Sequence, residues 1–324
     1  MKPVALIADR DFYPNASISR LEQFFEVRSS TASSQGELFD ELAALSAEVL
    51  FCNLSIKIDS RILKASANLL YIVSPATGMS HFDLGATQSK DVKILSLLDL
   101  RDQIQDIFAT AELAWGLIIS VSRKIIASNL DLLNGRLDRR DFLGRDLHGR
   151  TLGVIGFGRL GRRVATYGLA FGMKVVVYEI DESKRTSSIA VEFADSVEQM
   201  FGVADVVSVH IPLTEENYHF IDSEKIRRLK HGAIFVNTSR GEIVDECALV
   251  TALEDGKLFG VGADVLSIER SPNRVIGESD LIRANQAGLN VVLTPHIGGW
   301  ADFSVAKARN LIVDEFLNRY SKSI

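Results

Sequence analysis

Short apolar runs alternate with amphipathic stretches along most of the chain. The apolar runs have the length of buried strands and lie at 4–9, 48–52, 69–73, 92–97, 151–155, 174–178, 205–211, 233–236, 260–265 and 291–293. Helical periodicity is clearest at 18–25, 38–45, 245–253 and 303–320. Runs that are apolar throughout are typical of parallel strands, because crossover helices cover both faces of such a sheet. The alternation predicts an α/β protein, and 324 residues suffice for about two domains.

One stretch departs from this alternation. Residues 102–132 are strongly apolar along one side, and the pattern ends only at Asn134 and Gly135. It predicts one long helix or two helices in succession. A polar, basic segment at 136–150 then leads to the next predicted strand.

A glycine-rich turn follows the strand predicted at 151–155. Gly156, Gly158 and Gly161 fit the pattern G-x-G-x-x-G, whose glycines permit a tight turn, admit a pyrophosphate and let the helix approach the strand. A second strand ends at Glu179, eighteen residues after Gly161, close to where a carboxylate binds both ribose hydroxyls of a dinucleotide. The turn therefore predicts a dinucleotide site, although a strand–helix turn of this kind can also be purely structural.

Glu179 also bears on which dinucleotide binds. A carboxylate at this position favours NAD, because it would repel the 2′-phosphate of NADP. Lys184 and Arg185 follow closely in the sequence, so NADP stays the weaker alternative.

Composition and charge argue against several classes of protein. A net charge of −6 disfavours a general nucleic-acid binder. The N-terminus lacks the pattern of a signal peptide, and the best apolar run, 113–121, is too short to span a membrane, so we expect a soluble, cytoplasmic protein. Cys52 and Cys247 lie far apart in apolar stretches and are interpreted as buried thiols, with neither a disulfide framework nor a metal site.

Polar residues that could bind a ligand or take part in catalysis lie at the carboxyl ends of the predicted strands, namely Glu179, His210, Arg240, Asp264 and His296. In doubly wound sheets, ligands bind at those ends, whereas core residues lie within the strands. The pattern therefore predicts that the functional site lies at the edge of the sheet formed by the carboxyl ends of its strands.

Three residues could together carry out a hydride transfer to a carbonyl. Arg240 could bind a substrate carboxylate and polarise the carbonyl, since a guanidinium is always charged and bidentate. His296 could exchange a proton near neutral pH, and Glu269 could orient its imidazole. Each of the three, taken alone, could equally be a surface or turn residue.

With these residues in place, the chain resembles a known family, the D-isomer-specific 2-hydroxyacid dehydrogenases. Five motifs in the family's order carry the resemblance, together with Thr110-Ala111-Glu112 and Glu269; they lie at 153–161, 209–214, 237–241, 263–265 and 294–299. The resemblance implies an NAD-dependent enzyme that interconverts a D-2-hydroxy acid and its 2-oxo acid. It implies Arg240 as the substrate clamp, His296 as the acid/base and Glu269 as its partner.

The resemblance also implies the remaining contacts. Those to the cofactor are Gly156, Gly158, Arg159, Leu160, Gly161, Glu179, His210, Pro212, Thr238, Asp264, Gly298 and Thr110, the last near the nicotinamide. Those to the substrate are Leu54, Ser55, Thr77, Gly78 and Arg240, with backbone N–H groups of Thr77 and Gly78 on the carboxylate.

The family's architecture implies two doubly wound parallel-sheet domains. A Rossmann-type cofactor domain, 101–296, would be inserted into a flavodoxin-like substrate domain made of 1–100 and 297–324, and the cleft between them would close on substrate. A segment at about 102–140 resembles the family's dimerisation arm, which implies a homodimer.

The chain departs from the family pattern at three places. Arg270 replaces a proline after Glu269, Trp300 replaces a small residue after the Gly-Gly of the histidine motif, and the segment 78–83 partly loses its usual amides and acids. These changes concern substrate choice more than the reaction. No second arginine is evident for a phosphate, so glyoxylate, hydroxypyruvate and larger 2-oxo acids are better candidates than phosphoglycerate.

Two other functions remain open from the sequence. Some relatives with this fold act as NAD(H)-sensing corepressors that bind partner peptides, although this chain has no Pro/Ser-rich tail or basic arm. A formate-type dehydrogenase fits less well, because it would pair the histidine with an uncharged residue where Glu269 stands.

Overall fold

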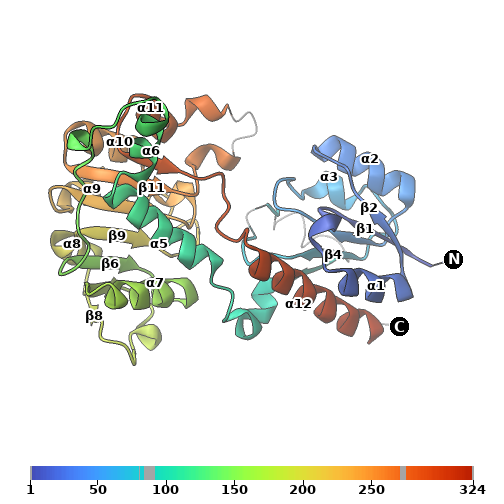
Figure 1. Ribbon diagram of the computed structural model, residues 1–324. Coiled ribbons are helices and arrows are strands. Elements are labelled where there is room, and N and C mark those ends of the chain that lie inside the picture. The colour runs from blue at the N-terminus through green and yellow to red at the C-terminus, as the bar shows by residue number, and fades with distance from the viewer. Residues whose placement is uncertain (1, 80, 84–91, 271–274, 323–324) are drawn as a thin grey trace. The chain divides into compact units, whose positions relative to one another are not determined.

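The computed structural model describes residues 2–79, 81–83, 92–270 and 275–322, without the side chain of Arg270. The chain forms two compact units (Figure 1). Unit 1 is Met1–Ile107 with Ala301–Ile324, and unit 2 is Phe108–Trp300. The boundaries expected from the sequence, after residues 100 and 296, lie a few residues before the observed ones.

The described part of unit 1 contains a five-stranded parallel sheet in the order β2-β1-β3-β4-β5, the flavodoxin-like order. Its strands are β1 (Val4–Ile7), β2 (Glu26–Ser29), β3 (Val49–Phe51), β4 (Tyr71–Ser74) and β5 (Lys93–Ser96). Its helices are η1 (Arg10–Phe12), α1 (Asn15–Phe24), α2 (Gln35–Leu45), α3 (Ser60–Leu63), η2 (Leu97–Ile104) and α12 (Asp302–Ser321).

Alternation along β1 explains how the helices divide between the two faces of this sheet. Ala5 and Ile7 pack with α1 and α12, whereas Leu6 packs with α2 and α3. The hydrophobic pattern does not predict β2, because this edge strand reads Glu-Val-Arg-Ser and is mostly exposed. An edge strand needs no apolar run, since only one neighbour and one face constrain it.

The described part of unit 2 contains a seven-stranded parallel sheet in the order β12-β11-β10-β9-β6-β7-β8. Its strands are β6 (Thr151–Ile155), β7 (Lys174–Tyr178), β8 (Glu192–Phe193), β9 (Val206–Val209), β10 (Ala233–Asn237), β11 (Leu258–Ala263) and β12 (Val291–Leu293). The chain winds outward from β6 in both directions, through β7 on one side and β9 on the other. Such a reversal is the switch point at which doubly wound sheets bind dinucleotides.

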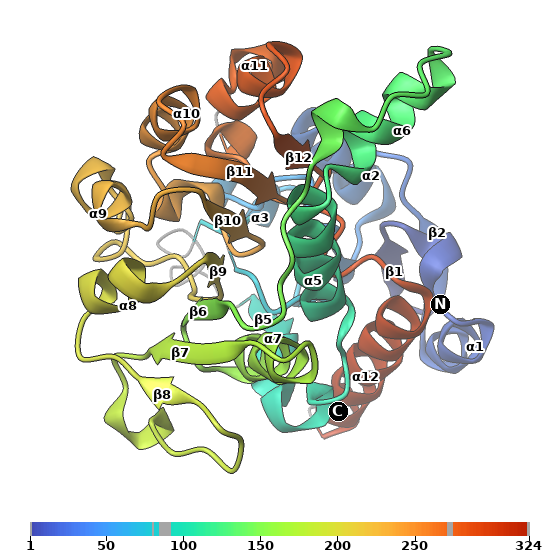
Figure 2. The ribbon, with the colours of Figure 1, turned by 60° about the vertical axis from the view of Figure 1, so that its left-hand side comes forward.

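Helices cover both faces of this second sheet (Figure 2). The described helices of unit 2 are α5 (Ala109–Ser122), α6 (Ile125–Leu133), η3 (Arg140–Phe142), α7 (Arg159–Ala170), η4 (Glu182–Lys184), α8 (Val197–Val203), α9 (Ser223–Arg228), η5 (Gly241–Ile243), α10 (Glu246–Glu254), η6 (Ser267–Arg270), η7 (Ile276–Glu278) and α11 (Asp280–Gln286). Helices α5 and α7 pack on one face, and α8 to α11 pack on the other.

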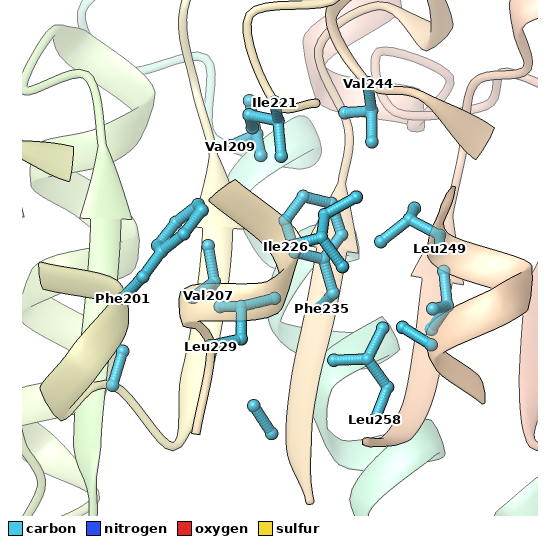
Figure 3. Close-up of a cluster of buried hydrophobic side chains, with 14 of the residues drawn as sticks. Phe201, Val207, Val209, Ile221, Ile226, Leu229, Phe235, Val244, Leu249 and Leu258 are labelled. Atoms are coloured by element: carbon cyan, nitrogen blue, oxygen red, sulfur yellow. The ribbon is translucent and has the colours of Figure 1, made fainter. Parts of the chain in front are cut away.

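Large side chains fill the face covered by α8 to α11 (Figure 3). Phe201 and Phe235 are fully buried there, from a helix and a strand respectively. Burial of such a side chain stabilises the fold by about 1.5–3 kcal/mol. The two doubly wound sheets confirm the predicted fold class.

The apolar stretch at 102–132 contains two helices in succession, one of the two predicted alternatives, since Lys124, with φ 51°, separates α5 from α6. Two details differ from the sequence-based expectations. The first is that α5 begins only at Ala109. Cys52 is buried as expected, but Cys247 is exposed on α10, so the second expectation is wrong. An apolar neighbourhood in sequence does not tell which side of a helix a residue occupies.

Among the described residues, no single helix is long and apolar enough to cross a membrane, although the neighbouring η2 and α5 meet that test when taken together.

Candidate active site

The glycine turn after β6 shows a separate physical reason for each of its glycines. Gly156 has φ 89°, and a Cβ there would lie 2.8 Å from the carbonyl oxygen of His210. Gly158 would place a Cβ in open space. A Cβ on Gly161 would lie 1.9 Å from the carbonyl oxygen of Gly156, so only glycine lets α7 pack so closely. The turn therefore leaves space where a pyrophosphate would approach.

Helix α7 begins directly after Gly158, which offers no side-chain cap. The first N–H groups of an α-helix have no acceptor within the helix, and its dipole favours an anion at that end. Arg159, the first residue, is partly buried, and burial lowers the pKa of its guanidinium. Leu160 packs against the core that α5 and α7 share.

Glu179 lies beside the glycine turn, as its sequence spacing predicts. The side chain is buried; one carboxylate oxygen accepts the N–H of Phe157 at 2.7 Å, and the other accepts the N–H of Asp181 at 2.9 Å. A carboxylate has about four lone-pair sites, so capacity remains for ribose hydroxyls. Arg185 donates to the carbonyl oxygen of Glu179 at 2.8 Å.

Two buried polar atoms at the ends of β9 and β10 have no hydrogen-bond partner among the described residues. They are Nδ1 of His210 and the hydroxyl of Thr238. The other ring nitrogen of His210 lies 2.8 Å from the Ser208 hydroxyl, and burial lowers the pKa of this histidine to about 4. Unsatisfied buried polar groups are rare, so these atoms fit a site made to hold a polar ligand such as a dinucleotide. Pro212 follows in the exposed loop after β9.

Hydrogen bonds fix the backbone on both sides of Arg240. Asn237 accepts the N–H of Ser239 at 2.9 Å and donates to the carbonyl oxygen of Arg240 at 2.8 Å. The hydroxyl of Ser239 donates to the carbonyl oxygen of Val209 at 2.8 Å, which ties the loop to β9. The guanidinium of Arg240 is partly exposed and donates to the carbonyl oxygen of Ser239 at 2.6 Å. Arg240 is thus a cation on a rigid loop at the carboxyl edge of the sheet.

The buried Asp264 holds the loop that carries His296. One of its carboxylate oxygens accepts the Thr294 hydroxyl at 2.6 Å and the N–H of Ile297 at 2.8 Å. The other accepts the N–H of Gly298 at 2.7 Å. Burial raises the pKa of Asp264, and these three hydrogen bonds oppose that rise. The family resemblance implies a cofactor contact for Asp264, and nothing in the sequence pattern predicts these loop contacts.

His296 itself adopts the left-handed backbone conformation, with φ 55°, which non-glycine residues rarely adopt. Its N–H donates to the carbonyl oxygens of Asp264 and Thr294, both at 3.0 Å. Such strain persists only where the surroundings over-determine the backbone, and it clusters at functional sites.

The structure brings Glu269 and His296 together. Nδ1 of His296 lies 2.7 Å from one carboxylate oxygen of Glu269, and the other oxygen accepts the N–H of Leu266 at 2.9 Å. The carboxylate therefore orients the imidazole and assigns a proton to Nδ1, which leaves Nε2 to exchange a proton. The histidine side chain is 41% exposed, so a substrate can reach it.

Thr110 and Gly298 meet beside this loop. A Cβ on Gly298 would lie 3.1 Å from the Thr110 side chain and 2.9 Å from the Asp264 carboxylate. The start of α5 is thereby placed against the loop that carries His296.

The other predicted substrate contacts belong to unit 1. Leu54 and Ser55 follow β3, and Thr77 and Gly78 follow β4, so both pairs lie at the carboxyl edge of that sheet. Leu54 is 51% exposed. Their roles in binding substrate stay predictions.

Comparisons with known proteins complete this description. The family model described as D-isomer specific 2-hydroxyacid dehydrogenase, NAD binding domain, matches residues 115–298. The chain is 34% identical over 288 residues to hydroxypyruvate reductase of Thermotoga maritima, a match covering 88% of each chain. It is 31% identical over 309 residues to glyoxylate reductase of Thermococcus litoralis, covering 92% of this chain and 88% of that one. A crystal structure of D-lactate dehydrogenase from Aquifex aeolicus, complexed with NAD and lactic acid, matches with a TM-score of 0.79 and 26% identity, over 98% of this chain and 96% of that one.

Proposed function

The chain belongs to the D-isomer-specific 2-hydroxyacid dehydrogenase family, and from this premise we propose that it reduces a small 2-oxo acid with His296, Glu269 and Arg240 as catalytic residues. It is an NAD-dependent oxidoreductase. The observation that carries the residue assignment is the 2.7 Å contact between Glu269 and His296 on the loop held by Asp264.

Each residue has a defined part in the proposed reaction. When bound, NADH supplies a hydride to the carbonyl carbon of the 2-oxo acid. His296 donates the proton that the carbonyl oxygen needs, so the 2-oxo acid, NADH and one proton become the 2-hydroxy acid and NAD⁺. Arg240 binds the substrate carboxylate and polarises the carbonyl. Glu269 stabilises the protonated imidazole before it gives up its proton.

The cofactor is NAD, and we propose how this chain selects it. The first turn of α7 would face the pyrophosphate, and Glu179 would accept the ribose hydroxyls. Two features support this assignment: the space beside Gly158 and the contact of Glu179 with the glycine turn. NADP is disfavoured because its 2′-phosphate would approach a buried carboxylate.

For the substrate we propose glyoxylate, hydroxypyruvate or a similarly small 2-oxo acid. The names of the relatives support this choice, and so does the absence of an evident second arginine among the predicted substrate contacts, which disfavours phosphoglycerate. Leu54, Ser55, Thr77 and Gly78 would contact the substrate together with Arg240. An interaction protein that only senses NAD(H) is the less favoured reading, because the named relatives are reductases and dehydrogenases.

The test is NADH oxidation, followed at 340 nm with a panel of 2-oxo acids and repeated with NADPH. We expect turnover with one or two small acids and a loss of ~10²–10⁴-fold for His296→Asn, the usual contribution of a general acid. Asparagine is the suitable replacement because it tolerates the left-handed conformation of this position. Tight NADH binding without turnover of any acid would refute the proposal in favour of NAD(H) sensing.

We further propose that the protein is a cytoplasmic homodimer that associates through the arm at about 102–140. Exposed leucines support this, because Leu133 and Leu137 in the arm are 75% and 92% exposed, and Leu143, just after it, is 82% exposed. Large exposed apolar groups in one segment mark an interaction surface. Light scattering should give twice the chain mass, and Leu133→Asp should give a monomer. Val203→Asp, at an exposed apolar site outside the arm, is the control. A monomeric wild type would contradict the proposal.

A further inference from the structure

A buried acid that the proposed mechanism does not use lies six residues after Arg240. Glu246 is the first residue of α10 and is 6% exposed. Helix α10 does not need it as a cap, because Asp245 precedes it and accepts the N–H of Ala248 at 3.0 Å. Burying a carboxylate is costly unless hydrogen bonds compensate, so the hydrogen-bond partners of Glu246 indicate which part of the fold it stabilises.

The contacts of Glu246 reach the segment that carries Glu269. One carboxylate oxygen accepts the N–H of Ser267 at 2.5 Å, and the other lies 3.4 Å from the hydroxyl of Ser279. Ser267 is the first residue of η6, and Glu269 lies two residues further in the same turn. Burial raises the pKa of Glu246, as does the neighbouring Asp280, whereas the bonds from the two serines oppose the rise.

Hydrogen bonds hold this turn from both sides. Glu246 accepts the N–H of Ser267. Glu269 accepts the N–H of Leu266, the residue before Ser267, at 2.9 Å. The peptide group that joins Leu266 to Ser267 also lies against Gly241, where a Cβ would be 2.1 Å from the carbonyl carbon of Leu266 and 2.2 Å from the nitrogen of Ser267. Backbones this close leave η6 little freedom, and they join it to the loop of Arg240.

We propose that Glu246 is a positioning residue that holds η6 so that Glu269 meets His296 at hydrogen-bond distance. This inference rests on the proposed function, since it concerns the same acid/base pair. Glu246 does not touch the imidazole; it acts through the peptide of Ser267 and then through Glu269. A displacement of ~1 Å at a catalytic group can cost ~10²-fold in rate. Loss of the hydrogen bond between Glu246 and Ser267 could therefore lower the rate even though Glu246 does not touch the imidazole.

Two substitutions test the inference with a matched control. Glu246→Gln keeps an acceptor for the Ser267 N–H, and its NH₂ group can donate to the Ser279 oxygen in place of the bond that this hydroxyl donates to Glu246, so kcat should fall less than ~3-fold. Glu246→Ala leaves that N–H without its acceptor, and kcat should fall ~10–100-fold, as for other groups that orient catalytic ligands, with the NADH dissociation constant within ~2-fold of wild type. Glu254→Gln, an exposed acid on the same helix, should behave as wild type.

The decisive readouts separate positioning from general instability. Among the described residues of unit 2, Glu269 contacts the imidazole of His296 and Asp264 interacts with it electrostatically. We expect Glu269→Gln to move the pH–rate profile toward lower pH, because the imidazolium loses its partner, and Glu246→Ala should move it in the same direction. In the Glu269→Gln background it should have little further effect, because residues that act as a unit are not additive. Circular dichroism and the milder glutamine variant show whether the alanine variant is folded.

A spectroscopic measurement keeps this inference distinct from the proposed function. The imidazole of His296 can be followed by NMR with labelled histidine and identified by its loss in His296→Asn. Its titration should move to lower pH in Glu246→Ala even if no 2-oxo acid is turned over, an outcome that would refute the proposed function alone. If the titration and kcat of folded Glu246→Ala match wild type, or the two substitutions are additive, the inference is wrong.

Discussion

Replacing Asp264 by asparagine tests how the loop of His296 is held. The carboxylate accepts three hydrogen bonds, from the Thr294 hydroxyl and from the N–H groups of Ile297 and Gly298. Asparagine has nearly the same shape but only one oxygen. Whichever way the amide is turned, its NH₂ group faces one of the two backbone N–H groups, so one hydrogen bond is lost and two donors confront each other.

The magnitude follows from two opposing effects. A hydrogen bond to a charged group contributes about 1.5–3 kcal/mol, and this one is replaced by a repulsive contact. Against this, asparagine removes a buried charge whose desolvation already raises the pKa of Asp264. That relief offsets only part of the lost bond and the repulsive contact, so the loop is destabilised by on the order of 1–2 kcal/mol.

Hydrogen exchange reads this loss directly in the cofactor-free protein. A loss of about 1–2 kcal/mol corresponds to ~5–30-fold faster exchange of the Ile297 and Gly298 amides, since 1.4 kcal/mol is a factor of ten. With His296 less well held, kcat should fall ~10–100-fold. Asp255→Asn, at the exposed end of α10, is the control. Exchange within twofold of wild type, together with weak NADH binding, would show that Asp264 acts on the cofactor and would refute this reasoning.

Three further predictions concern the cofactor side of unit 2. Gly161→Ala should destabilise the protein by about 3 kcal/mol or more in urea unfolding, because its Cβ would lie 1.9 Å from a carbonyl oxygen. Gly158→Ala should unfold like wild type yet bind NADH weakly in fluorescence titration; equal effects at both positions would contradict the separate roles. Glu179→Gln should raise the ratio of kcat/KM for NADPH to that for NADH by ~10-fold or more, because it removes a charge that repels the 2′-phosphate, and an unchanged ratio would exclude Glu179 as the selector. Burial lowers the pKa of His210 to about 4, so the folded state favours the neutral ring. The stability it contributes is full above pH 6.5 and is lost as the pH falls toward 4, about 3 kcal/mol in all. His210→Gln should flatten the dependence of unfolding free energy on pH in this window, and an equally steep dependence would count against the assignment.

The sequence predicted those features that depend on local pattern. The parallel sheets follow from uninterrupted apolar runs such as β9, and the glycine turn follows from residues within six positions of one another. The position of Glu179 at the glycine turn could be predicted because it ends the strand after that turn, and the spacing between β6 and β7 is short and regular.

Features that depend on distant partners could not be read this way. The contacts of Asp264 join residues 30 to 34 positions apart, and the contact of Glu246 with Ser267 spans 21 positions. Nothing in the local pattern marks such residues, since a buried acid and an exposed acid look alike in sequence. The exposed Cys247 and the edge strand β2 were misjudged for the same reason: burial is decided by neighbours from elsewhere in the chain.

The place of α12 in unit 1 has a consequence for how the protein is made. Phe316 is fully buried in unit 1, with its ring 5.3 Å from the rings of Phe51 and Tyr71 and 5.6 Å from that of Phe25. On the ribosome, residues 1–107 therefore wait for almost the whole chain to be synthesised before their core can close. Unit 2 is continuous and can fold while translation proceeds. Residues 1–107 are thus made before unit 2 but completed only after it, and the apolar surface that α12 will occupy stays uncovered until then.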